Sequence, residues 1–448
     1  MMGIQEISPL IVKNGLRLGA DEVAAITTHS TSRQVRFANN EITVTKTWDE
    51  IRASILLKKD RRVLIASISE LSTEGIQKAL KDLTSMVSLM APHKDYAPLP
   101  QGPFKYQTIS GVYDKRIPQL QDRNVDYVES AINSALDNGG KRAAGTLQTT
   151  DSEAFLTTSC DVDATQRKTT IKMVVRCLSN GESSGMGITC GTNLKTFDPE
   201  EAGREAGRLA KMSKGLKPGK AGRYEVILSR IASSGLFDII GGMSSAFYVD
   251  SGFSCLAERL GEKIASEELV VYDDPTASEG LGSAPFDDEG YPTSRTTIIE
   301  EGKLRSYLHN SLTAKKHQTK STANAGWINP RASNIVVKEG RLTEEELFKD
   351  VKDGLYVNNL TYIRFQDYRK GDFTASTRDG VFRIKDGEIT EPIKGLRLSD
   401  NLTRILGNIN GLSKEAKQIS HWWMGFRTPS VKTPSVRVKD VGFTVPTK

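Results

Sequence analysis

The chain has 448 residues, of which 38% are hydrophobic and 26% charged. This composition is typical of folded globular proteins and excludes a largely disordered chain. The formal net charge of +6 is a mild surplus that does not by itself indicate a nucleic-acid partner.

No stretch approaches the roughly 18 apolar residues that a membrane-spanning helix needs, and the start lacks the basic and apolar regions of a signal peptide. We therefore expect a cytoplasmic protein. The four cysteines form no C-x-x-C pair and are expected to be reduced, mostly buried thiols. They are Cys160, Cys177, Cys190 and Cys255.

The N-terminal part begins with a helical segment and continues as alternating strands. Apolar residues on both sides of Asn39 and Asn40 predict a hairpin, because asparagine tolerates the required turn. The alternation resumes over residues 51–57 and turns at the charged residues 58–62. We expect a meander of about four strands.

Helices follow, separated by further strands. Ser72 stands at an N-cap position before apolar residues at helical spacing. A second helix is expected over 125–136, stopped by Asn138 and two glycines, and a third begins after Asp198. Strands are expected over 141–195, and this order of elements favours an α+β fold over a doubly wound sheet.

Glycines and lysines before a strand at 223–229 indicate a boundary, giving an N-terminal α+β domain over 1–222 and a β-rich domain over 223–448. In the second half, Gly302 and Gly387 lie between alternating runs and predict two hairpins. Thr343 is expected to cap a helix.

Two motifs resemble catalytic or metal sites but have simpler explanations. Gly181, Ser183 and Gly185 match G-x-S-x-G, but strand-like sequence on both sides predicts a hairpin tip rather than a nucleophile elbow. The carboxylates in FDDEG, residues 286–290, could hold a hard cation. The flanking Pro285 and Gly290 favour a solvated turn.

The five histidines provide no helical chelate, because no two lie three or four residues apart. His309 and His317 are eight residues apart, with lysines at 315 and 316 that would repel a cation. The remaining three are His29, His93 and His421.

The last 35 residues carry a basic surplus and could form a phosphate-binding surface with aromatic side chains. The alternative, which we favour because the charges are dispersed, is a β-rich closing segment with a solvated face. The basic residues are Lys414, Lys417, Arg427, Lys432, Arg437, Lys439 and Lys448, and the aromatic ones are Trp422, Trp423 and Phe426.

Residues 233–274 look like an active-site helix and its exit strand, although this stretch contains no histidine. With several later segments, the stretch resembles the TldD/PmbA family, whose members include peptidase subunits once described as modulators of DNA gyrase. The supporting segments, in order, are RFANNEI, LGEKIASEELVVYDDP, FDDEGYPTSRTTIIEEGKLRSYLHNSLTAKK, STANAG, GDFTAS, IKDGEI and TPSVRVKDVGFT.

The resemblance implies a zinc site that this chain does not reproduce. In the family's metalloprotease subunit, two histidines and a glutamate lie in a His-Glu-x-x-x-His motif, and a cysteine near the C-terminus is the third ligand. The corresponding residues here are Phe237, Asp238 and Gly242, with Ser420 in place of the cysteine. Neither a phenyl ring nor a bare backbone has a lone pair to offer, and a hydroxyl is a poor zinc ligand.

A chain without these zinc ligands is similar to the family's second subunit, called PmbA or TldE. This similarity implies a two-layer sheet-and-helix N-terminal part, a larger β-rich C-terminal part, no metal in this chain, and zinc in a TldD-like partner. The expected assembly is a cytoplasmic heterodimer that degrades or processes flexible peptides, with a homodimer when the chain is alone. Residues Ile239, Ile240, Met243, Phe247 and Tyr248 would serve an interface or this subunit's own core.

Two other functions remain open. The chain could be an autonomous peptidase with an unrecognised site around Asp287, Asp288, Glu289, His309 and His421. Alternatively, it could be a nucleic-acid or gyrase-associated factor that binds through its basic C-terminal segment.

Overall fold

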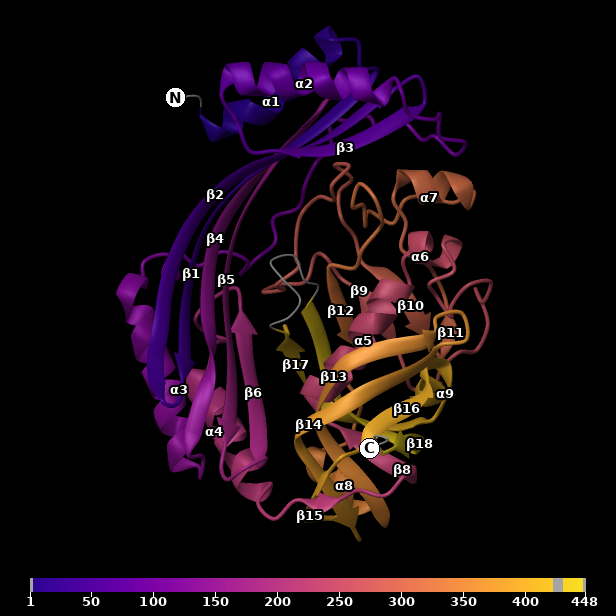
Figure 1. Ribbon diagram of the computed structural model, residues 1–448. Helices are drawn as coiled ribbons and strands as arrows, with labels where there is room; N and C mark the ends of the chain where they lie inside the picture. Colours follow the sequence, from indigo (N-terminus) through magenta and orange to yellow (C-terminus); the bar gives the residue numbers. More distant parts are fainter. Residues whose placement is uncertain (1–2, 422–429, 446–448) are drawn as a thin grey trace.

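The computed structural model describes residues 3–421 and 430–445. Figure 1 shows a long curved sheet from the first half of the chain and, beside it, a strand-rich unit from the second half. The class is α+β, as expected, because helices pack on mostly antiparallel sheets.

The first half forms a six-stranded antiparallel sheet in the order β3-β2-β1-β4-β5-β6. Four of its strands are far longer than the usual five or six residues and curve along the whole molecule. The strands are β1 (Glu22–Ala38), β2 (Glu41–Lys59), β3 (Arg62–Ile68), β4 (Arg142–Thr158), β5 (Val162–Leu178) and β6 (Ser184–Gly191).

Helices cover one face of this sheet in two groups. Val23 and Ala25 of β1 pack against α1 and α2, and Val35 and Phe37 of the same strand pack against α3 and α4. Successive side chains of a strand alternate between faces, so these odd-numbered residues belong to one face. The helices are α1 (Ile4–Arg17), α2 (Thr73–Val87), α3 (Asn124–Asp137) and α4 (Pro199–Met212), with a 3-10 turn at Gln121–Arg123.

Most local expectations for this half are confirmed. Asn39 and Asn40 form the hairpin turn with φ of 53° and 70°, and Ser72 accepts the N–H of Gly75 at 3.0 Å as the cap of α2. The expected meander of about four strands is wrong, because residues 41–59 form one continuous strand. The polar sequence in its middle contains neither glycine nor proline, so the strand does not break there.

The second half forms a 12-stranded mixed sheet whose central strands are β12, β18, β8 and β13. Its strands are β7 (Lys217–Pro218), β8 (Gly222–Leu228), β9 (Val271–Asp273), β10 (Thr296–Glu300), β11 (Lys303–Leu304), β12 (Asn334–Val337), β13 (Asp353–Asp367), β14 (Asp372–Lys385), β15 (Glu388–Lys394), β16 (Arg397–Asn401), β17 (Ile409–Ile419) and β18 (Ser430–Thr444). We propose the division into 1–222 and 223–448, because β8 begins at Gly222 and only the two-residue strand β7 of this sheet precedes it.

Short helices accompany the second sheet, and α5 is the longest of them. They are α5 (Arg230–Met243), α6 (Ala246–Asp250), α7 (Ser311–Lys316), α8 (Glu344–Lys349) and α9 (Leu402–Gly407). Both expected hairpins form, with Gly302 and Gly387 in their turns at φ of 71° and 83°. Thr343 caps α8 as expected. Across 3–421 and 430–445, no helix is long and apolar enough to cross a bilayer.

The two halves meet along a shared apolar seam. Val174, Met186 and Ile188 of the first sheet pack against Ile231 at the start of α5 and Ile419 at the end of β17. The seam therefore fixes the first turn of α5 against the curved sheet.

A buried carboxylate adds a polar connection across the same seam. The side chain of Asp379 is 2% exposed. It accepts hydrogen bonds from Arg176 at 2.7 Å and Ser184 at 2.8 Å, both from the first sheet, and from Asn359 at 3.2 Å. Because breaking a buried ion pair leaves an unpaired charge, this contact also disfavours separation of the halves.

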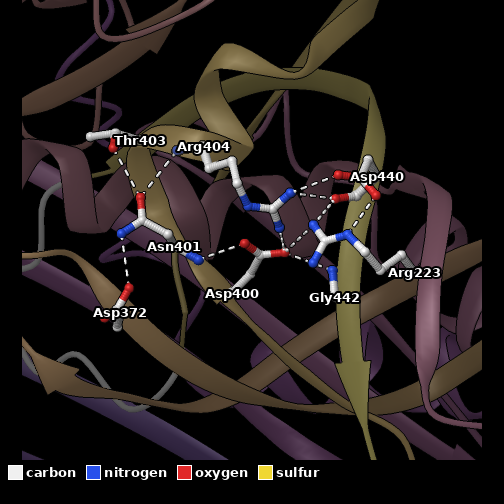
Figure 2. Close-up of polar contacts among 8 residues, drawn as sticks. All are labelled: Arg223, Asp372, Asp400, Asn401, Thr403, Arg404, Asp440 and Gly442. Carbon is white, nitrogen blue, oxygen red and sulfur yellow. Dashed lines mark hydrogen bonds and ion pairs between the residues drawn. The ribbon is translucent and has the colours of Figure 1, made fainter.

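An ion-pair network stabilises the far end of the second sheet (Figure 2). The side chain of Asp400 is 2% exposed, and it accepts hydrogen bonds from Arg404 and from the N–H of Gly442, the latter at 2.6 Å. Arg223 lies 2.5 Å from Asp440, which also pairs with Arg404 at 3.0 Å. Two guanidinium groups and two carboxylates thus join β8, β16, α9 and β18, and each charge has an opposite partner.

Candidate functional site

Helix α5 lies at the centre of the second half and leaves strand β8 through a single capping residue. The Oγ of Ser229 accepts the N–H groups of Ile231 and Ala232 at 3.1 and 3.3 Å. Leu236 and Ile240 are buried in the large core of this half. The helix is therefore held along its length by packing and at its start by a cap.

Phe237, at the first expected histidine position, is fully buried. Its exposure is 0%, and it is among the largest completely buried side chains of the protein. The ring belongs to the main core of the second half, with Leu236 and Ile240. The side chain at this position therefore serves packing.

Asp238, at the glutamate position, is partly buried on the neighbouring face of the helix. Burial raises the pKa of Asp238 to about 7. Within the part of the chain that the structure describes, neither a hydrogen bond nor an ion pair reaches its carboxylate. A carboxyl in this condition carries a mixture of charged and neutral forms near neutral pH.

The two adjacent glycines of α5 have different surroundings. A side-chain carbon on Gly241 would lie 2.7 Å from Ile335 of β12, so only glycine fits there without displacement. A carbon on Gly242 would meet no atom within 4 Å. The second expected histidine position is therefore open to a side chain, although the sequence supplies none.

His421, not Ser420, contacts the helix from the end of β17. Its Nε2 lies 2.7 Å from the Oγ of Ser234, one helical turn before Asp238. Burial lowers the pKa of His421 to about 4. Ser420 is 3% exposed, and its Oγ has no hydrogen-bond partner among the described residues.

These donors do not fit a zinc ion of the kind that the resemblance implies. Zinc in proteins takes thiolate, imidazole or carboxylate ligands, usually three or four together. The described positions offer a buried ring at Phe237, no side chain at Gly242, a hydroxyl at Ser420 and one carboxylate at Asp238. His421 supplies a single imidazole, whose Nε2 already bonds Ser234. No catalytic step through zinc follows from this donor set.

The FDDEG carboxylates organise a turn, but the expectation of a solvated turn is wrong, because Asp287 is 7% exposed and Glu289 5%. Asp287 accepts the N–H groups of Glu289 at 3.0 Å and Tyr291 at 2.9 Å, and burial raises its pKa well above the ordinary range. Asp288 pairs with Arg331 at 2.7 Å. Of the residues that the structure describes, no three His, Cys, Asp or Glu side chains are arranged to hold a metal.

His309 and His317 come together, which their eight-residue separation did not predict. Their ring centroids are 5.2 Å apart, and His317 lies 2.8 Å from Asp250. Burial and the neighbouring His317 lower the pKa of His309 to about 4. His421 lies elsewhere, against α5, so the histidines proposed for an autonomous peptidase do not converge.

The remaining sequence motifs have structural roles. Ser183 lies at the β5–β6 hairpin tip and donates to the carbonyl of Ser213 at 2.7 Å, so the G-x-S-x-G match is a turn. In the C-terminal segment, Lys417 pairs with Glu201 at 2.9 Å and Arg437 is buried. Trp422, Trp423, Phe426, Arg427 and Lys448 lie outside the described residues.

Strand β13 presents an open edge beside α5. Residues 354–357 pair with both β8 and β14, whereas residues 359–367 pair only with β14 within the described structure. Ile363 and Leu360 of this edge approach Gly235 of α5. Unpaired backbone N–H and C=O groups therefore run next to the candidate site.

Three features of this site could not be read from the sequence. The bond between Ser234 and His421 joins residues 187 positions apart, and no local pattern indicates it. The same holds for the burial of Phe237 and for the β13 edge, since both depend on which distant segments pack together.

Three family models match the chain, and together they cover most of it. They are described as PmbA/TldA metallopeptidase domain 1 over residues 24–87, the central domain over 118–214 and the C-terminal domain over 221–445. A metalloprotease from Methanothermobacter thermautotrophicus is 34% identical over 228 residues, which is 50% of each chain. This chain thus spans about half the length of the curated relatives that it matches at this level.

Two solved structures share the fold over nearly their whole length. TldE from Thermococcus kodakarensis superposes with a TM-score of 0.85 at 23% identity, covering 97% of this chain and 99% of that one. A Thermotoga maritima protein, described as a proposed modulator of a DNA gyrase, gives a TM-score of 0.85 at 21% identity over 99% and 100%. At these identities the likeness concerns the fold alone.

Proposed function

Because the chain belongs to the PmbA/TldD metallopeptidase family, we propose that it is the metal-free, non-catalytic subunit of a TldD/TldE-type zinc metalloprotease complex. A partner with a His-Glu-x-x-x-His motif binds the zinc and hydrolyses the peptide bond. This chain stabilises that partner and forms part of the enclosure around flexible or unfolded peptides.

The observation that carries the proposal is the donor set on and beside α5. A phenyl ring, a bare backbone and a hydroxyl occupy the places of two imidazoles and a thiolate at Phe237, Gly242 and Ser420. Asp238 retains a carboxylate, but without a metal-bound water of lowered pKa it has no nucleophile to activate. The helix is nevertheless well packed, which suits a structural subunit.

The open edge of β13 supports a role in holding peptides. Backbone groups at an unpaired edge can add an extended peptide as a further strand, and such bonds accept many side-chain sequences. Residues 359–367 form this edge next to α5. A peptide held at this edge would also have to enter the partner's active site. Peptide contact by this subunit is therefore part of the proposal.

We place the complex in the cytoplasm. The four cysteines are free, three of them buried and Cys160 partly so. Free, unpaired thiols are usual in a reducing compartment.

Co-purification from the native cell tests the proposal. The expected result is a complex with a subunit that bears His-Glu-x-x-x-His, with zinc measured by elemental analysis in the complex but not in this chain alone. Casein or unfolded-peptide hydrolysis should require both subunits.

A matched pair of variants makes the test specific. Substituting the glutamate of the partner's motif should abolish hydrolysis, whereas Asp238→Asn in this chain should leave it unchanged. Stoichiometric zinc together with hydrolysis by the isolated chain would instead establish an autonomous peptidase. Salt-sensitive DNA binding that is lost when residues 414–448 are neutralised would favour the nucleic-acid function.

A further inference from the structure

A small cavity opens on the helix-covered face of the first sheet. It lies between the residues of β1 that pack against α1 and α2 and those that pack against α3 and α4. Drug-sized ligands occupy pockets of about 300–1,000 Å³, so this cavity is limited to a small molecule. Its volume is about 220 Å³, and it is lined by Thr31, Arg33, Ile117, Pro118, Thr149 and Asp151.

Strand pairing brings four of these side chains together. Thr31 lies directly opposite Asp151, and Arg33 lies directly opposite Thr149. Directly opposite residues, and residues two positions apart on one strand, share a face of the sheet. Arg33 and Asp151 are therefore diagonal neighbours, about 7–8 Å apart. The two charged side chains border the same cavity without forming an ion pair with each other.

Arg33 is the positive end of the cavity. Its Nη1 donates to the carbonyl oxygen of Pro118 at 3.2 Å, and no carboxylate in residues 3–421 and 430–445 pairs with it. The neighbouring Ile117 is 1% exposed and belongs to the core under α3 and α4, so this wall is firmly held. A guanidinium has five N–H donors and matches a carboxylate with two parallel bonds, so Arg33 can bind an anion.

Asp151 is the negative end. Its side chain is 16% exposed and lies 3.0 Å from Arg167. Arg167 also pairs with Glu153 at 3.1 Å, so two carboxylates share one guanidinium and the three groups keep one negative charge. This remaining charge favours a cation at the Asp151 end.

We infer that the cavity binds the zwitterion of a free α-amino acid, with its carboxylate at Arg33 and its ammonium at Asp151. The two charged groups of such a ligand are about 3 Å apart, and each makes a hydrogen bond of about 2.8 Å. Ligand and bonds together span roughly 8 Å, which is the length of the diagonal. The hydroxyls of Thr31 and Thr149 border the same space and can bond either group.

A ligand with a single charge fits this cavity less well. A simple anion at Arg33 would lie near the uncompensated carboxylate charge, and a simple cation at Asp151 would lie near the unpaired guanidinium. The lining residues are odd-numbered, whereas Val174, at the seam with α5, lies on the opposite face of the sheet. The inference is therefore independent of the proposed catalytic role.

Calorimetric titration of the purified full chain with L-alanine tests the class of ligand. We expect saturable binding with a dissociation constant of about 0.1–1 mM, because so small a ligand makes few contacts. Propionate lacks the ammonium and alaninamide lacks the carboxylate. Each should bind at least about tenfold more weakly than L-alanine, because it loses one charge-assisted contact.

Substitutions of the two charged residues test the location. Arg33→Gln and Asp151→Asn should each weaken L-alanine binding at least about tenfold. Arg36→Gln is the matched control and should leave binding unchanged, because Arg36 is exposed on the opposite face of β1. Circular dichroism checks that each variant is folded.

Three results would overturn the inference. The first is no saturable binding of L-alanine up to about 10 mM, roughly ten times the weakest dissociation constant expected. The second is binding of propionate or alaninamide as tight as that of L-alanine. The third is an equal effect of Arg36→Gln and of the folded cavity variants.

Discussion

The carboxyl of Asp238 provides a pH-dependent test of the site. Burial raises its pKa from 3.8 to about 7, so the folded protein favours the neutral form. As the pH rises above about 4, the unfolded chain ionises first and the folded state becomes relatively less stable, until the penalty levels off above about pH 7. Each pKa unit corresponds to about 1.4 kcal/mol, and the shift of about three units gives an upper bound of about 4 kcal/mol.

Partial exposure of this side chain reduces that bound, because solvent screens the charge. We expect Asp238→Asn to change stability little at pH 4 and to increase it by about 2 kcal/mol at pH 8. Urea unfolding at the two pH values measures the difference. Asp82→Asn, which removes an exposed carboxylate from α2, is the matched control and should show no comparable gain. Equal effects of Asp238→Asn at both pH values would refute the reasoning.

Four further substitutions address the packing of α5. Gly241→Ala should destabilise the protein by about 1–3 kcal/mol through a clash with β12, whereas Gly242→Ala should be neutral or stabilising by up to about 1 kcal/mol. If Gly241→Ala and Gly242→Ala had equal urea midpoints, the close contact of Gly241 with β12 and the open space at Gly242 would both be contradicted. Phe237→Ala should cost about 3–5 kcal/mol in unfolding free energy, and a loss below about 1 kcal/mol would mean that the ring is not part of the core. Ser234→Ala should cost about 1 kcal/mol by removing its bond to His421, without changing the zinc content of the purified chain.

Features governed by neighbouring residues could be predicted from the sequence. Asn39 and Asn40 tolerate positive φ, and Ser72 and Thr343 have oxygens suited to capping, so the hairpin and two helix starts follow from side-chain chemistry. The continuous strand over 41–59 could not be anticipated, because polar residues on both faces resemble a loop when strand pairing is unknown.

Features of the site that depend only on the type of residue at a position could also be predicted from the sequence. Without any coordinates, the residue types show that Phe237 and Gly242 have no side-chain zinc ligand and that Ser420 has only a poor one. The sequence did not indicate that Phe237 faces the core, that His421 reaches Ser234, or that His309 approaches His317. Each of these depends on contacts between segments distant in the chain, for which one sequence contains no periodic signal.

The structure makes the two expected histidine positions unequal. At Gly242 there is room for a side chain, so a single substitution could introduce an imidazole without disturbing the helix. At Phe237 the ring fills the core completely, so a histidine there would bury a polar ring at a cost of a few kcal/mol unless it found a partner. Introducing a metal site would therefore require repacking the core around α5, not only exchanging donor atoms. The ring of Phe237 is thus part of what holds this helix in place.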